Sequence, residues 1–270
     1  MNAFPPAPVT VGVSLKMYFG QREARDWFAR VAQLVRAPGG SGRAVMDGAV
    51  ELFVIPGYLA VQPAIAAFSG TPVLLGAQDL AAEDSGAFTG EVSGAELAEI
   101  GVRVAEVGHA ERRRLFGETD QVVAAKTAAA LRNGIVPVLC LGETEPGSAE
   151  AAAVSVVTQL HSALDGATAG RVIVAYEPVW AIGAAEPAAS GHIVTVARAL
   201  RAALDTLPDR AGSSVVYGGS AGPGLLTRLA GAVDGLFLGR FAHDPQVLDA
   251  VLAEAAELAA ARTTASGVSA

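Results

Sequence analysis

One carboxylate, in the segment 173–183, is the residue of this chain best suited to chemistry. Glu177 follows a short apolar run and precedes Pro178 and an apolar stretch that ends at Gly183. A carboxylate between an apolar strand and an apolar loop is shielded from water, and burial disfavours its charged form, which makes it a stronger base. An isolated glutamate in such a place more often caps a helix or forms a salt bridge. Here the neighbours along the chain favour a base.

Lys16 and His109 are two further candidates, because each comes at the end of an apolar run. Lysine is rare in this chain: the 19 basic side chains include only Lys16 and Lys126, so a lysine at a strand end is not simply surface charge. For Lys126, within a helical pattern, we expect an exposed position. A histidine outside any motif is more often structural, and this is our interpretation of His161, His192 and His243.

Short apolar runs alternate with longer helical patterns along the chain. The expected strands are 10–15, 50–55, 73–77, 102–107, 136–141, 172–175, 214–217 and 235–238. The expected helices are 21–36, 59–68, 95–100, 118–133, 148–165, 190–207, 224–229 and 245–261. The glycine-rich residues 39–42 predict a flexible surface loop, and the small polar residues of 262–270 predict a frayed tail.

Eight strands that alternate with helices predict a parallel sheet with right-handed crossovers. This number of repeats has the size of a closed barrel of about 250 residues, so we predict a single α/β domain, a (β/α)8 barrel, for residues 1–270. A doubly wound open sheet is the alternative, although no G-x-G-x-x-G follows a strand. A barrel would bring the carboxyl ends of all strands, and with them the candidate residues, to one rim.

The composition argues against several classes of partner. A net charge of −8 disfavours nucleic acids and anionic membranes, which bind broad basic surfaces. Cys140 is the only cysteine, so no internal disulfide forms and no Cys-x-x-Cys metal motif is present. No apolar run is long enough to span a membrane, and the first eight residues do not resemble a signal peptide. We expect a cytoplasmic protein without a metal or cofactor.

Seven segments resemble the triosephosphate isomerase family, in that family's order and over nearly the whole chain. They are residues 14–17, 86–91, 108–113, 116–120, 140–143, 175–183 and 217–220. The resemblance implies a (β/α)8 barrel that interconverts glyceraldehyde 3-phosphate and dihydroxyacetone phosphate through an enediolate, as in glycolysis and gluconeogenesis.

The resemblance also implies roles for the three candidates. Glu177 matches the family's base, His109 its electrophile, and Lys16 the cation beside the developing oxyanion. Glu111 would orient the lysine, and a short helix that begins after His109 would keep the imidazole neutral.

Backbone N–H groups in glycine-rich turns are expected to bind the substrate phosphate. The positions that match the family's donors or support them are Gly183, Gly218, Gly219, Ser220, Gly239 and Arg240. A short helix that starts near residues 222–224 would direct its positive end at the anion. The loop 181–188 would close over the substrate and exclude water, which prevents loss of phosphate from the enediolate.

The resemblance further implies a homodimer. Thr89 lies in the segment 86–91, which matches the family loop that inserts into the partner subunit near its lysine. Without the resemblance, this segment would be interpreted as a plain surface loop. The expected partners are a second copy of the chain and a small phosphorylated sugar.

Four positions depart from the family pattern. The asparagine two places before the lysine is Ser14, the serine after the histidine is Ala110, the usual lid hinge is replaced by residues 184–187, and the second glycine after the eighth strand is Arg240. These changes leave the base, the electrophile and the cation in place but alter the walls around them. The arginine adds a full charge and a forked donor near the phosphate.

The sequence therefore leaves three functions to separate. The main prediction is triosephosphate isomerase activity. Family members with Gly-Arg after the eighth strand resemble isomerases of four-carbon ketose phosphates, such as erythrulose phosphate, and this is the first alternative. The second is a non-catalytic barrel that binds sugar phosphates, although retention of Glu177, His109 and Lys16 counts against it.

Overall fold

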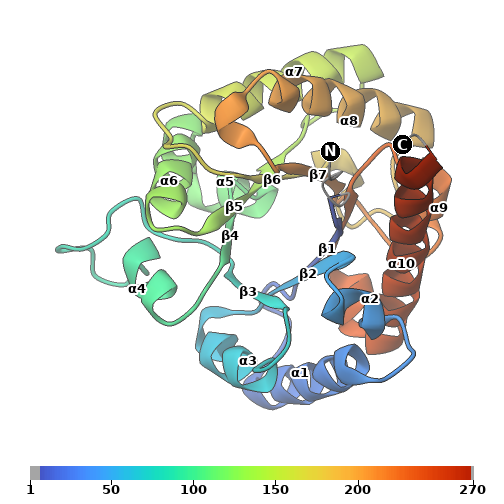
Figure 1. Ribbon diagram of the computed structural model, residues 1–270. Coiled ribbons are helices and arrows are strands. Elements are labelled where there is room, and N and C mark those ends of the chain that lie inside the picture. Colours follow the sequence, from blue (N-terminus) through green and yellow to red (C-terminus); the bar gives the residue numbers. More distant parts are fainter. Residues whose placement is uncertain (1–6, 269–270) are drawn as a thin grey trace.

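Eight parallel strands close into a barrel in the computed structural model, which describes residues 7–268 (Figure 1). Neighbouring strands pair in sequence order, and the last pairs with the first. They are β1 Val9–Ser14, β2 Val50–Ile55, β3 Leu74–Ala77, β4 Val104–Val107, β5 Val136–Leu141, β6 Ile173–Tyr176, β7 Ser214–Tyr217 and β8 Gly235–Leu238. The predicted barrel is confirmed, and the open sheet is wrong. Residues 1–6, part of the segment compared with signal peptides, lie outside the described residues.

Helices form a ring around the strands (Figure 1). The α-helices are α1 Gln21–Arg36, α2 Gly42–Met46, α3 Val61–Ala67, α4 Gly94–Glu99, α5 Ala110–Phe116, α6 Asp120–Arg132, α7 Ala149–Ala163, α8 Ser190–Asp205, α9 Leu225–Leu229 and α10 Pro245–Val268. The 3-10 helices are η1 Tyr58–Ala60, η2 Val179–Ala181, η3 Pro208–Arg210 and η4 Arg240–His243. Ser93, Thr119 and Ser148 begin three of the helices, since each side chain accepts a hydrogen bond from an N–H of the first turn. None of the described helices is long and apolar enough to cross a membrane.

Two helices differ from the sequence prediction. The helix α2 begins at Gly42, inside the segment expected to be a flexible loop. A Cβ on this glycine would lie 2.3 Å from the carbonyl oxygen of Leu34, so its lack of a side chain lets α2 pack on α1. The helix α10 continues to Val268 instead of fraying from Arg262, whose Nη2 donates to the carbonyl of Val233 at 3.2 Å. Residues 269–270 lie outside the described residues.

Two apolar layers hold the barrel. The inner layer is made by inward-facing side chains of the strands, namely Phe53, Ile55, Val104, Val138, Cys140, Ile173, Ala175, Val216 and Phe237. The ring of Phe53 fills the space beside Gly12, where a Cβ would lie 2.0 Å from the ring Cζ. The outer layer packs strands against helices and includes Trp27 and Phe28. A packed interior makes the barrel a rigid platform for the residues at its rim.

Lys126 is buried, so the expected exposed position is wrong. Its Nζ lies 2.7 Å from both carboxylate oxygens of Asp79 and 2.6 Å from Glu118 Oε1. Arg112 pairs with the same two carboxylates, at 2.8 Å and 2.5 Å. Two cations and two anions thus balance in one cluster, which ties the segment after β3 to α5 and α6.

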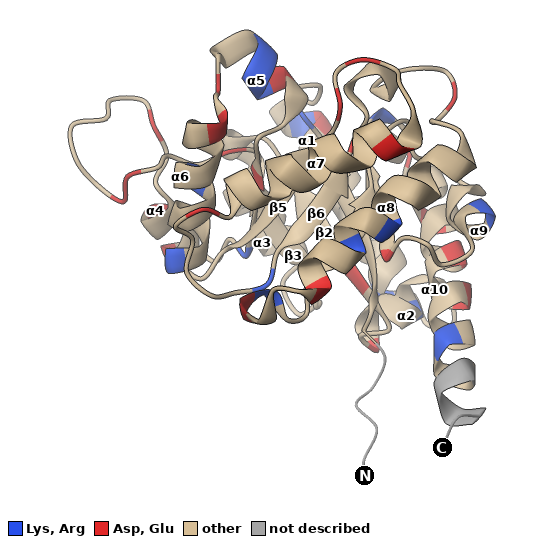
Figure 2. Ribbon diagram, turned by 90° about the horizontal axis from the view of Figure 1, so that it is seen from above, with Lys and Arg blue, Asp and Glu red and all other residues tan. Residues whose placement is uncertain are grey.

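The carboxyl ends of the strands lie on one side of the molecule. In Figure 2, α2, which precedes β2, lies at one side of the barrel, and α5, which follows β4, stands at the opposite side. Lys16, His109 and Glu177 come just after β1, β4 and β6. The fold therefore brings these three distant segments to the same rim.

Candidate active site

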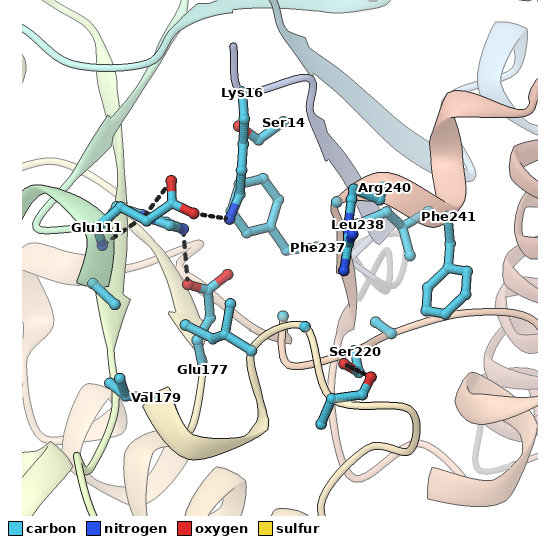
Figure 3. Close-up of a pocket in the computed structure, with 18 of the residues that line it drawn as sticks. Ser14, Lys16, Glu111, Glu177, Val179, Ser220, Phe237, Leu238, Arg240 and Phe241 are labelled. Atoms are coloured by element: carbon cyan, nitrogen blue, oxygen red, sulfur yellow. Dashed lines mark hydrogen bonds and ion pairs between the residues drawn. The ribbon is translucent and has the colours of Figure 1, made fainter. Parts of the chain in front are cut away.

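A cavity of about 550 Å³ opens at this rim (Figure 3). Its lining includes the predicted residues Ser14, Lys16, His109, Glu111, Glu177, Gly183, Gly218, Ser220, Gly239 and Arg240. Gly219 does not line the cavity: a Cβ there would lie 2.7 Å from Tyr217 Oη, so this glycine allows close packing behind the wall. Figure 3 shows Lys16, Glu111 and Glu177 toward one end of the cavity and Ser220 and Arg240 toward the other.

Glu177 is held in a space that two glycines leave open. A Cβ on Gly142 would lie 1.9 Å from the carbonyl oxygen of Glu177, and a Cβ on Gly218 would lie 2.4 Å from its Oε1. The side chain is buried, and no described residue forms a hydrogen bond with its Oε2. Burial, and after it the charge of Glu106, raises the pKa of Glu177 to about 8. An unpaired carboxylate oxygen shielded from water is well suited to accept a proton from carbon.

His109 presents a hydrogen-bond donor to this carboxylate. The backbone N–H of Glu111 donates to His109 Nδ1 at 3.1 Å, so the proton of the neutral ring is on Nε2. The Nε2 atom lies 3.6 Å from Glu177 Oε2. Burial, and after it the charge of Lys16, lowers the pKa of His109 to about 4. The imidazole is therefore neutral near pH 7 and offers an N–H to the cavity.

Lys16 supplies the positive charge of the site. Its Nζ lies 3.0 Å from Glu111 Oε1, and its φ is 47°, in the left-handed region. Such a backbone costs about 1–3 kcal/mol in a residue with a side chain, and it persists where neighbours hold it. Here Gln78 Nε2 donates to the Lys16 carbonyl at 2.7 Å. Burial opposes the ammonium charge, but the carboxylates of Glu111, Glu177 and Glu106 outweigh it and raise the pKa of Lys16.

Glu106 is a residue of this site that the sequence analysis missed. This residue lies in β4 and is 3% exposed, and Ser14 Oγ donates to its Oε2 at 2.9 Å. Its Oε1 lies 3.7 Å from His109 Nε2. Burial raises the pKa of Glu106 to about 7, against the hydrogen bond from Ser14 and the charge of Lys16. The signal was a carboxylate at an inward-facing position of the apolar strand Val104–Val107.

The other end of the cavity is built from turns and one arginine. Ser220 has a φ of 40°, and its Oγ lies 2.9 and 2.8 Å from the carbonyl oxygens of Ala181 and Ala184, which share its single O–H donor. The guanidinium of Arg240 reaches toward Gly183, where a Cβ would lie 3.6 Å from Nη2. Among the described residues, none forms an ion pair or hydrogen bond with this guanidinium, so its charge is available to an anion in the cavity.

The helix start near residues 222–224 is not free to bind an anion, and this prediction is wrong. The helix α9 begins at Leu225, and the carboxylate of Glu254 in α10 accepts hydrogen bonds from the N–H groups of Gly224 and Thr227. The first residues of η4, which begins at Arg240, line the cavity instead. The carboxylate of Glu254 could not be foreseen, because it comes from a helix distant in sequence.

The loop 181–188 lines the cavity with Ile182, Gly183 and Ala184. At its end, the N–H of Ala188 donates to Tyr217 Oη at 3.1 Å. At its start, Trp180 Nε1 donates to Glu143 Oε1 at 3.0 Å, and His192 Nε2 lies at the same distance from that oxygen. His192 thus supports the hinge of the loop, in agreement with a structural interpretation.

The described residues contain no group of three or more His, Cys, Asp or Glu side chains arranged to hold a metal ion.

Comparisons with known proteins agree with this geometry. The family model of triosephosphate isomerase matches residues 9–255. An L-erythrulose-1-phosphate isomerase of Pectobacterium atrosepticum is 49% identical over 92% of this chain and 95% of its own, and a triosephosphate isomerase of Symbiobacterium thermophilum is 40% identical over 92% and 96%. The crystal structure of a triosephosphate isomerase from Bartonella henselae has a TM-score of 0.73, with 27% identity over 92% of this chain and 98% of that one.

Fold and site together define a (β/α)8-barrel enzyme of the isomerase class. The chain belongs to the triosephosphate isomerase family. It is an aldose–ketose-type isomerase, as the sequence predicted, and the non-catalytic alternative is set aside.

The pKa of Glu177 predicts the pH dependence of catalysis. A base must be ionised, so kcat/KM should rise with pH and level off only above about pH 8, the pKa of this carboxyl group. Glu106→Gln removes a neighbouring negative charge, which lowers the pKa of Glu177 and moves the rise to lower pH. Steady-state rates between pH 5.5 and 10 would measure both profiles, and a wild-type profile that is flat from pH 6 to 9 would contradict the prediction.

Proposed function

We propose that this protein isomerises L-erythrulose 1-phosphate, a four-carbon ketose phosphate, by proton transfer between adjacent carbons. The observation that carries the proton transfer is the unpaired Oε2 of Glu177, which lies 3.6 Å from the Nε2 of a neutral His109. Lys16 adds a positive charge beside the same space. A base, a donor and a cation around one cavity are the groups that this reaction requires.

The reaction balances without a co-reactant. Glu177 removes the proton from C3, next to the C2 carbonyl, and the electron pair moves to the carbonyl oxygen. The N–H of His109 and the ammonium of Lys16 stabilise the resulting oxyanion of the enediolate. Return of a proton to C2, with transfer of a hydroxyl proton between O3 and O2, leaves the carbonyl at C3. The product is erythrulose 4-phosphate.

The preference for four carbons is supported by the relatives and by the altered walls. The relative at 49% identity is named L-erythrulose-1-phosphate isomerase, and so is one of Mesorhizobium japonicum at 40% over 86% of this chain and 91% of its own. Ser14 is shorter than the asparagine common in the family, and Arg240 replaces a glycine.

Because sugar phosphates are ionised metabolites that do not cross membranes unaided, we propose a cytoplasmic location and a role in carbohydrate metabolism.

Interconversion of glyceraldehyde 3-phosphate and dihydroxyacetone phosphate is the second candidate. It needs the same three side chains, Glu177, His109 and Lys16, and all of them line the cavity. The relative from Symbiobacterium thermophilum at 40% identity carries the name triosephosphate isomerase.

Kinetics on purified protein separate the two candidates. We expect kcat/KM for L-erythrulose 1-phosphate to exceed that for dihydroxyacetone phosphate by about tenfold or more. A site built to hydrogen-bond an additional substrate hydroxyl discriminates strongly against a substrate that lacks it. Glu177→Gln should lower both rates by about 10³-fold, since the base is lost.

Two outcomes decide against parts of this proposal. Triose turnover without any tetrulose turnover would leave the second candidate. Equal rates for the wild type and Glu177→Gln, measured by exchange of carbon-bound hydrogen in deuterated water, would remove Glu177 from the mechanism.

We further propose that the phosphate binds between Gly183, Ser220, Gly239 and Arg240. The guanidinium of Arg240 lines this end of the cavity and has no ion-pair or hydrogen-bond partner within residues 7–268. A forked guanidinium can bind two phosphate oxygens, and the backbone N–H groups of the glycines add neutral donors.

Arg240→Gln tests this role of the arginine. It keeps a polar side chain, although a shorter one, and removes the charge, so KM should rise about tenfold while kcat changes little. Arg43→Gln, at an exposed side chain of α2, is the matched control and should change neither constant. A lower kcat at unchanged KM would instead assign Arg240 to the chemical step.

We also propose that the protein is a homodimer in which the loop with Thr89 enters a groove of the partner. The segment between β3 and α4 projects away from the barrel (Figure 1). A second cavity of about 650 Å³ lies beside Lys16 and is bordered by exposed apolar side chains. These are Met17, Leu59, Leu115 and Phe116, with 96%, 86%, 64% and 67% of their surface exposed. Such a patch favours a protein partner.

Thr89→Arg tests the dimer. A long charged side chain in an apolar groove should shift the protein toward monomers in analytical ultracentrifugation and lower its turnover, because Lys16 lies on the same groove. Arg43→Ala, on the exposed helix α2, should leave the dimer intact. A wild-type protein that sediments as a monomer at micromolar concentration would overturn the dimer.

A further inference from the structure

Ser14 and Glu106 form a buried polar pair above the apolar barrel interior, where the main cavity and the second cavity beside it approach each other. Their side chains are joined by a hydrogen bond of 2.9 Å, and the residues are 2% and 3% exposed. The cluster of buried side chains inside the barrel is apolar. A buried carboxylate is costly unless it has partners, and the proton transfer through Glu177, His109 and Lys16 does not require it.

The pair leaves space where most of the family carries a larger side chain. Serine at position 14 carries a hydroxyl group in place of the larger carboxamide group of asparagine. Ser14 lines both the main cavity and the second cavity beside it, and Glu106 lines the second. The Oε1 atom of Glu106 lies 3.7 Å from His109 Nε2, which is longer than a hydrogen bond, so this oxygen can still accept one.

The direction of a bound substrate follows from the two ends of the cavity. A phosphate beside Arg240 places the reacting carbons next to Glu177, which lies toward the opposite end of the cavity (Figure 3). The next atoms of the carbon chain, away from the phosphate, then reach the side of the cavity where Ser14 lies. A four-carbon ketose phosphate differs from a three-carbon one by a single hydroxymethyl group at that end.

We propose that Ser14 and Glu106 form the subsite for this terminal hydroxymethyl group, and that Glu106 determines the preference for four carbons by accepting a hydrogen bond from its hydroxyl. The proposal rests on the function proposed above and names the residues that set its substrate length. A three-carbon substrate leaves the carboxylate without this partner, and sites built to bind a hydroxyl discriminate strongly against analogues that lack it.

The first test is the ratio of kcat/KM for L-erythrulose 1-phosphate to kcat/KM for dihydroxyacetone phosphate. It is measured at pH 9, above the pKa of Glu177, so that a change in the ionisation of this carboxyl group does not affect the rate. Glu106→Leu should lower this ratio by about tenfold or more, whereas Glu106→Gln, which keeps an oxygen acceptor, should retain it within about threefold. Ser14→Asn, which refills the space, should lower the ratio as well.

The second test measures binding without turnover. Calorimetry with glycerol 3-phosphate and erythritol 4-phosphate, which differ by one hydroxymethyl group, should show tighter binding of the longer ligand by the wild type. Glu106→Leu should abolish this preference. Thermal unfolding of each variant checks that the fold is retained.

The outcomes separate the subsite from the function. A wild type that prefers the longer ligand but does not turn over L-erythrulose 1-phosphate overturns the function and keeps the subsite. A wild type that turns over the tetrulose, with equal losses on both substrates in Glu106→Leu, overturns the subsite and gives Glu106 a general role. If Glu106→Gln is as poor as Glu106→Leu, the charge acts through His109 and the proposed hydrogen bond is wrong.

Discussion

The shielding of one carboxylate from water is the constraint on which the rest of the site depends. Glu177 keeps a raised pKa because its side chain is buried and its Oε2 has no partner. That position exists because Gly142 and Gly218 have no side chains to fill it. The closed barrel supplies the rigid strand ends that hold both glycines in place. A more open sheet would let water reach the carboxylate and weaken it as a base.

The charges around this carboxylate act as one unit. Glu106 raises the pKa of Glu177, while Lys16 opposes that rise and also keeps His109 neutral. The hydrogen bond between Glu111 and Lys16 fixes where the positive charge lies. A change at any of these side chains therefore alters the ionisation of the others, and single substitutions will not add independently.

Much of the fold and site was predictable from local sequence patterns. The eightfold alternation of strands and helices predicted the barrel. The motif segments indicated Glu177, His109 and Lys16 as site residues, and each of them follows an apolar strand. Two of the errors share one cause, which is a contact between residues distant in sequence. Lys126 is buried because Asp79 lies beside it, and the start of α9 is occupied by a carboxylate from α10. Neither the alternation of strands and helices nor a single motif shows such contacts.

The hydroxyl group of Ser220 affects how readily the loop 181–188 can open. Its single O–H is shared by the carbonyls of Ala181 and Ala184, so the loop that lines the cavity moves away only when this contact breaks. One such hydrogen bond contributes about 1 kcal/mol net, which permits frequent opening yet keeps the loop in place most of the time. One short side chain thus links the opening of this loop to the turn after β7, which lines the same cavity.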